Sequence, residues 1–148
     1  RPANAFVAGF IGNPPMNLLP ARVTAHDAAG VRLDVGGQPF TARRPVDGLA
    51  AGADVTVGVR PEALHPAPDG TGIETRVEHL EHLGHETLAH LRLATAGVRV
   101  VARLPGRVEH APGDAVRIVP DPDRVYLFAP DGRALSMERP VGGPSASR

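Results

Sequence analysis

The chain has 148 residues, contains neither cysteine nor lysine, and balances 16 arginines against 16 acidic residues. Without cysteine there is no disulfide framework, and without lysine there is neither a Schiff-base site nor the Gly-Lys-Ser/Thr loop that cradles nucleotide phosphates. The zero net charge argues against a general nucleic-acid or anionic-membrane binder. No apolar run approaches the roughly 20 residues that span a bilayer, so we expect a soluble chain.

The first segment is the one place where a helix is expected. Four apolar residues fall on a single helical stripe there, namely Phe6, Val7, Phe10 and Ile11. Gly12 and the prolines that follow would end the helix. The sequence therefore predicts a short linking helix within residues 1–14.

From residue 15 onward the apolar period is two, which is typical of β-strands. Alternating apolar positions run from Leu19 to Ala25, and turn residues lead into further runs at Val31 and Phe40. The strongest break is the Pro- and Gly-rich stretch 66–72. We therefore expect a first β-module at 15–68.

A second β-module is expected at 69–137, opening with the alternating run from Ile73 and including a hairpin about Gly84. The remaining residues, 138–148, are mostly Gly, Pro, Ser and Ala and predict a disordered tail. The chain as a whole is thus predicted to be mainly β.

One stretch occurs twice, as GADVTVGVRPEAL from Gly52 and as GDAVRIVPDPDRV from Gly113. Each copy has a turn glycine, a strand with alternating apolar residues, and a corner at Pro61 or Pro122 that returns to an apolar residue. Two similar β-modules packed together would explain the repeat. The alternative is chance, because turn–strand–turn patterns are common in all-β proteins.

The charged corner Arg60-Pro61-Glu62 closes the first copy of the repeat. A rigid proline turn would point the arginine and the glutamate outward. The corner is therefore either a solvated turn, in which exposed charges contribute little, or part of an interface.

Four histidines cluster in the second module, at His79, His82, His85 and His90. An odd offset within a strand places His79 and His82 on opposite faces, so a metal site is not expected. His85 with Glu81 and Glu86 could be an acid–base set, but no nucleophile can be placed beside them. We expect no catalysis, no metal and no cofactor in this chain.

Four motifs that occur in order suggest a family. They are FVAGFIGNPPMN at 6–17, GVRPEAL at 58–64, LGHE at 83–86 and RVYLFAPDGRAL at 124–135. Together they resemble the C-terminal regulatory (TOBE) region of the ATP-hydrolysing subunits of ABC sugar importers of the maltose and glycerol-phosphate type. The resemblance implies two OB-like β-barrel modules that are not catalytic by themselves.

The resemblance also implies partners. In this family a nucleotide-binding domain, which carries the Walker and signature motifs and uses ATP and Mg²⁺, precedes the regulatory region. The ATPase subunits form a homodimer beneath two membrane permease subunits, on the cytoplasmic face of the membrane. The residues expected by similarity to make regulatory or dimer contacts are Arg60, Glu62, Glu86, Phe128 and Gly132.

The sequence favours two other functions less. A molybdate-like oxyanion module is one, because Asn17, Leu19 and Val23 resemble the strand pattern of such proteins, although the serine-arginine pair that precedes it there is absent. Nucleic-acid binding by an OB-like face is the weaker one, because it needs stacking aromatics and positive charge, and this chain has four Phe, one Tyr and no Trp.

Overall fold

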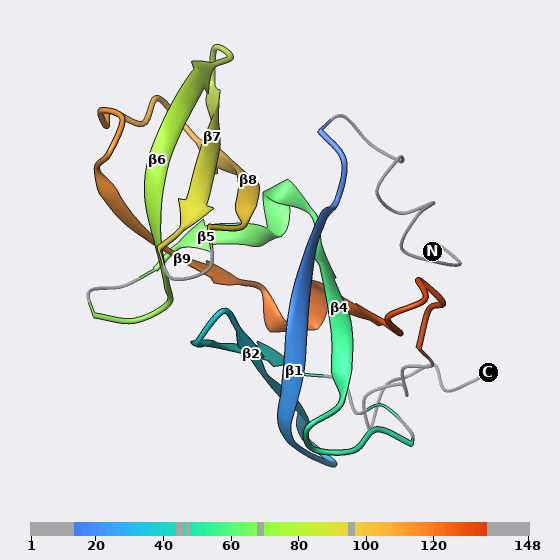
Figure 1. The fold of residues 1–148 in the computed structure, drawn as a ribbon. Coiled ribbons are helices and arrows are strands. Elements are labelled where there is room, and N and C mark those ends of the chain that lie inside the picture. Colours follow the sequence, from blue (N-terminus) through green and yellow to red (C-terminus); the bar gives the residue numbers. More distant parts are fainter. Residues whose placement is uncertain (1–13, 44–45, 47, 68–69, 95–96, 136–148) are drawn as a thin grey trace, which may run out of the picture.

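The computed structural model describes residues 14–135, except 44–45, 47, 68–69 and 95–96 (Figure 1). The predicted linking helix and the predicted disordered tail lie outside the described residues. No helix among the described residues is long and apolar enough to cross a membrane.

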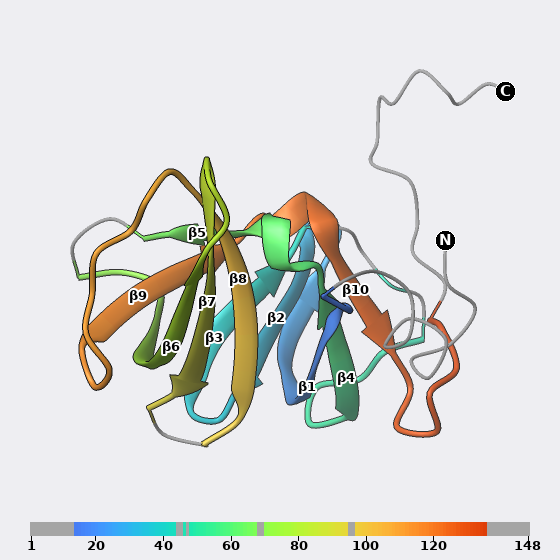
Figure 2. The ribbon, with the colours of Figure 1, turned by 90° about the horizontal axis from the view of Figure 1, so that it is seen from above.

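In the part of the chain that the structure describes, ten strands form two five-stranded antiparallel sheets (Figures 1 and 2). In order across the first sheet they are β10 (Val125–Phe128), β4 (Asp54–Val59), β1 (Asn17–Asp27), β2 (Gly30–Val35) and β3 (Gln38–Ala42). In order across the second they are β5 (Leu64–Pro66), β9 (Ala115–Pro120), β6 (Ile73–His82), β7 (Glu86–Leu93) and β8 (Arg99–Pro105). The prediction of a mainly β, OB-like fold with two similar halves is confirmed.

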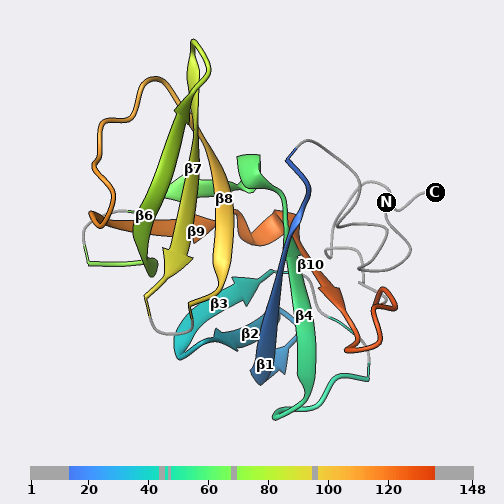
Figure 3. The same cartoon turned by 45° about the horizontal axis from the view of Figure 1, so that its top comes forward.

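The two halves exchange their last strands. After β4 the chain turns through a short 3-10 helix, η1 (Pro61–Ala63), and β5 then pairs with β9 of the other half. After β9 it turns through η2 (Pro122–Arg124), and β10 pairs with β4. Figure 3 shows β4 and β10 side by side, although β4 comes before the whole second half and β10 is the last strand of that half. Each sheet therefore needs residues from both halves.

The repeat seen in the sequence carries the same pairing register in both sheets. Leu19 is opposite Val57 in the first sheet, and Ile73 is opposite Ile118 in the second. Both long strands also have an irregularity at the corresponding place, between Val23 and Ala25 in β1 and between Val77 and His79 in β6. Such bulges increase strand twist and bending, which explains how each sheet curls toward a barrel.

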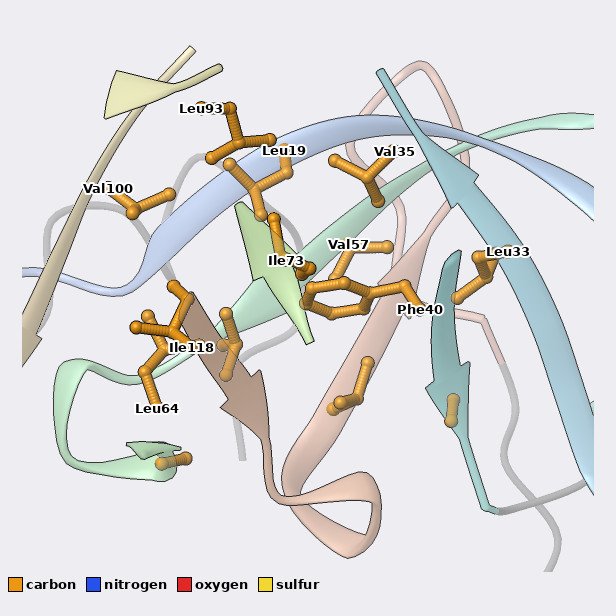
Figure 4. Packing of buried hydrophobic residues seen from close by; sticks show 14 of the residues in the cluster. Leu19, Leu33, Val35, Phe40, Val57, Leu64, Ile73, Leu93, Val100 and Ile118 are labelled. Carbon is orange, nitrogen blue, oxygen red and sulfur yellow. The ribbon is translucent and has the colours of Figure 1, made fainter. Parts of the chain in front are cut away.

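The inner faces of both sheets meet in one hydrophobic core (Figure 4). Its fully buried side chains alternate with exposed ones along the strands, as a strand with one buried face requires. The core includes Leu19, Leu33, Phe40, Val57, Leu64, Ile73, Leu93, Val100 and Ile118. Because residues from both halves share this core, packing as well as strand exchange holds the halves together.

Candidate functional site

The proline corners η1 and η2 meet where the strands cross between the sheets (Figure 2). The Asp121 N–H donates to the Ala63 carbonyl at 2.8 Å, which ties the start of η2 to the end of η1. Pro61 and Ala63 are buried, whereas Glu62 is exposed. The hydrophobic side of the first corner therefore faces the core and its charged side faces solvent.

An ion pair joins the two corners at the surface. A Glu62 carboxylate oxygen lies 3.7 Å from an Arg124 guanidinium nitrogen, and both side chains are 46% exposed. Exposed pairs of this kind contribute at most about 1 kcal/mol. The backbone hydrogen bond between the corners and the buried Pro61 fix this region, so Glu62 and Arg124 remain a charged feature on a rigid surface.

The outer face of the first sheet carries a second, smaller apolar cluster, which we call the outer patch. Its members are Met16, Leu18, Tyr126, Phe128 and Ala134. Phe128 and Met16 are buried within it, and Leu18 and Tyr126 are partly exposed. The surface that the outer patch offers is therefore made by Leu18, Tyr126 and Ala134 rather than by Phe128.

Gly132 lies in the turn that completes the outer patch. Its N–H donates to the Ala129 carbonyl at 2.8 Å, and the Ala129 N–H donates to the Arg133 carbonyl at 2.8 Å. The positive φ of 92° at Gly132 favours glycine. This turn returns the chain so that Ala134 bridges to Phe128, which links Phe128 and Gly132 in one local structure.

Glu86 lies elsewhere, at the start of β7 on the second sheet. Its carboxylate forms an ion pair with Arg103 of β8, and both side chains are about one-third exposed. The structure thus brings Arg60 and Glu62 together at the corner and Phe128 and Gly132 together at the outer patch. Strand β10 joins these two places, and Glu86 belongs to a different surface.

The histidines pair with neighbours on the second sheet. His79 and His90 are opposite each other across β6 and β7, with ring centroids 5.3 Å apart. His90 Nε2 lies 2.9 Å from a Glu81 carboxylate oxygen. In the part of the chain that the structure describes, no three or more metal-binding side chains converge.

Two buried carboxamides join the sheets, a role that the sequence analysis did not assign. The Asn17 amide donates to the carbonyls of Val59 at 3.1 Å and Val101 at 2.9 Å, and its oxygen accepts from the Val101 N–H at 2.8 Å. Gln38 likewise donates to the Glu74 carbonyl at 3.1 Å and accepts from the Glu74 N–H at 2.6 Å. For Gln38 the sequence does hold a signal: it shares the inward face of its strand with Phe40 and Ala42, where a polar side chain needs a hydrogen-bond partner.

The pKa of Asp27, at the end of β1, is lowered by its neighbours. The N–H of Ala29 donates to an Asp27 oxygen at 2.8 Å, and Arg32 lies 3.4 Å from the other oxygen. The backbone bond first and the arginine second lower the pKa of Asp27 below its ordinary value. This group stabilises the turn between β1 and β2 and faces solvent.

Two protein-family models match the chain. A MalK OB fold domain model matches residues 12–64, and a TOBE domain model matches residues 57–128. Together these models extend from just before β1 to the end of β10.

Curated relatives are ATP-binding proteins of importers. The chain is 44% identical to the sn-glycerol-3-phosphate import ATP-binding protein UgpC of Cereibacter sphaeroides, over 91% of this chain and 36% of the relative. It is 37% identical to the maltose/maltodextrin import ATP-binding protein MalK of Salmonella typhimurium, over 90% of this chain and 37% of the relative. The chain therefore spans about a third of the length of these relatives.

Solved structures that share the fold include a molybdate-binding protein. It is the cytoplasmic molybdate-binding protein ModG with molybdate bound, at a TM-score of 0.62 over 77% of this chain and 96% of that one. The identity is 20%, so the likeness is one of fold alone.

Proposed function

The chain belongs to the family of MalK-type OB-fold and TOBE domains, and we propose that it is the regulatory and dimerisation region of an ABC importer's ATP-binding subunit. This membership confirms the resemblance drawn from the four ordered sequence motifs. The similarity to importer ATP-binding proteins over about nine-tenths of the chain is the observation that carries the proposal.

In this proposal the chain does no chemistry. A nucleotide-binding domain elsewhere in the subunit binds ATP and Mg²⁺, contacts the permease subunits, and lies at the cytoplasmic face of the membrane. The present chain contributes a rigid body, because the exchanged strands and the shared core couple its two halves. The imported solute is a sugar or a related compound such as a glycerol phosphate.

The proposed contact surface combines the exposed side of the outer patch with the charged corner. Leu18 and Tyr126 supply apolar area, and Arg60 and Glu62 supply charge at the other end of β10. Phe128 and Gly132 act beneath this surface by holding the outer patch in place. Glu86 would make a separate regulatory contact from the second sheet.

The oxyanion alternative receives less support. Asn17, one of the three residues that suggested it, uses its whole amide group to join β1 to Val59 and Val101. An anion at this place would have to break those buried hydrogen bonds, each of which is costly to leave unmade.

The chain's lack of cysteine offers a direct test of the contact surface. Single cysteines replace Leu18, Tyr126 or Glu62, and an Arg99→Cys variant on the second sheet is the matched control. Under mild oxidation we expect covalent dimers from the first three positions, alone or in mixed pairs, and monomer from the control, as read on non-reducing gels. Equal dimer formation by Arg99→Cys would contradict the proposed surface.

A further inference from the structure

A hollow of about 250 Å³ lies between the sheets, beside the free edge of β3. Its walls are mainly apolar and come from β3, β6, β9 and the start of η2, including Phe40, Ile73, Val119, Pro120 and Pro122. Thr41 of β3 also lines it. Figure 3 shows β3 at the side of the first sheet that faces the second. Nothing in the proposed function uses this hollow.

The internal repeat supplies a counterpart for this hollow in the other half. Thr41 is opposite Arg32 as Val101 is opposite His90, so Thr41 and Val101 hold equivalent places on the two edge strands. Pro120 in the second sheet likewise corresponds to Val59 in the first, because Leu64 is opposite Pro120 as Val125 is opposite Val59. At Val101 the place is filled, because the Asn17 carboxamide bonds the N–H and the carbonyl of Val101 and also the Val59 carbonyl.

The backbone of Thr41 points its N–H and carbonyl toward the hollow. Backbone groups alternate in direction along a strand, and two residues later the Arg43 N–H donates away from the sheet, to the Pro122 carbonyl at 2.8 Å. The Arg32 carbonyl accepts from the Thr24 hydroxyl of β1 at 3.1 Å, which is the side away from β3. Thr41 therefore presents one donor and one acceptor at an edge.

In the second half the register position of Asn17 falls on Thr71, which lies ahead of β6 and does not line the hollow. Ile73 takes the register position of Leu19, so the position of Leu18 falls on Gly72, whose φ is 81°. A Cβ on Gly72 would lie 2.5 Å from the Ile118 carbonyl oxygen. The chain therefore leaves the strand path here, and β6 begins only at Ile73.

We propose that this hollow binds a primary carboxamide with a small apolar body, which bonds the Thr41 N–H and carbonyl as Asn17 bonds Val101. A carboxylate lacks the donor, and an ammonium group lacks the acceptor. An added β-strand is disfavoured, because Pro39 has no N–H and the Arg43 N–H is already bonded to Pro122, so Thr41 supplies the one outward donor along this edge. The apolar walls would contact the body of the ligand.

The test is an NMR titration of the whole ¹⁵N-labelled chain with benzamide. We expect the largest amide shift at Thr41 and a dissociation constant of about 1–10 mM, as suits a small ligand with two neutral hydrogen bonds. Benzoate has the same shape without the donor and should bind about tenfold more weakly. Equal shifts from benzoate, sulfate or molybdate would show an anion site and overturn the proposal.

Variants locate the site. Thr41→Pro removes the outward N–H and should abolish binding, whereas Thr41→Val keeps it and should bind as the original chain does. Val119→Phe places a ring in the hollow and should also abolish binding, which tests the site if Thr41→Pro does not fold. Retained benzamide binding in a folded Val119→Phe chain would refute the assignment.

A second pair of probes distinguishes the source of the carboxamide. N-acetylglutamine methylamide carries it on a peptide side chain, and N-acetylalanine methylamide offers backbone amides alone. Tighter binding of the glutamine probe than of benzamide would indicate a polypeptide ligand, and the reverse a small molecule. Equal binding of the two peptide probes would mean that a backbone is recognised and would overturn the proposal.

Discussion

The outer faces of the two sheets differ although their inner faces and registers correspond. The first sheet carries the outer patch of apolar side chains, with a turn folded over its edge. The second carries ion pairs across β6, β7 and β8, formed by Glu78, Glu86, Arg92, Arg99 and Arg103, which we call the charged face. The features that both halves share are the inward apolar positions and the pairing registers, and these are what the common core and the strand exchange require. The outer faces are released from that requirement, so their side chains can differ between the two sheets.

Among the variants of the two outer faces, Phe128→Ala in the outer patch should lower stability the most. Removing a fully buried ring leaves a cavity next to Met16, and we expect the free energy of unfolding to fall by about 3–5 kcal/mol. Urea unfolding followed by circular dichroism measures this loss. Leu83→Ala at an exposed position is the control, with a change within about 0.5 kcal/mol. Similar values for the two variants would mean that the outer patch is not packed.

Exchanging corresponding residues of the two outer faces gives a smaller effect. Gly58 and Val119 occupy equivalent positions, and a Cβ on Gly58 would lie 2.6 Å from Met16 Sδ and 2.8 Å from Phe128 Cε2. Gly58→Val should therefore lower stability by about 1–3 kcal/mol through overpacking. Val119→Gly should lower it by about 1 kcal/mol or less, through strand propensity alone. A Gly58→Val chain as stable as the original would contradict the claim that the first sheet has no room for a side chain at position 58.

On the charged face we expect Glu78→Gln to cost less than about 1 kcal/mol. Glu78 meets both Arg92 and Arg99, but all three side chains are partly exposed, so solvent screens the pairs. The loss should shrink as salt is added, because mobile ions screen exposed charges. Chemical unfolding at low and high salt measures both effects, and a loss that persists in high salt would contradict a solvated face.

The smallest expected effect concerns the β1–β2 turn of the first sheet. The lowered pKa of Asp27 favours the folded chain above the ordinary aspartate value, and this contribution is lost as the pH falls through the folded-state value. Arg32→Gln should raise the Asp27 pKa part of the way back, because the Ala29 N–H remains bonded. Carboxyl NMR titration reads the change, and an unaltered midpoint would exclude any influence of Arg32.

The sequence was sufficient to predict the strands and turns, but it did not predict that β5 pairs with β9 and β10 with β4. Alternation and turn residues placed the two copies of the repeat, and their common register followed from equivalent apolar positions such as Val57 and Ile118. The exchange could not be predicted, because Leu64 and Val125 would bury equally well against either half. Whether the modules divide at residue 68 stays a prediction, and the sheets themselves mix both halves.

The candidate site shows the same limit. The motif that contains Phe128 and Gly132 was visible, but burial of the ring under a returning turn depends on Met16 and Gly58, which are distant in sequence. The Glu62–Arg124 pair likewise joins residues from the two copies of the repeat. Contact roles for Arg60, Glu62, Glu86, Phe128 and Gly132 remain predictions.

The exchanged strands also constrain how the molecule can be assembled during synthesis. When the ribosome has completed β5, the first sheet still lacks the strand that covers β4, since β10 is the last strand to be made. An uncovered strand edge can pair with another nascent chain. The final structure therefore forms only after residue 128 has left the exit tunnel, and a stop codon shortly before that point would leave the β4 edge of the first sheet open to aggregation.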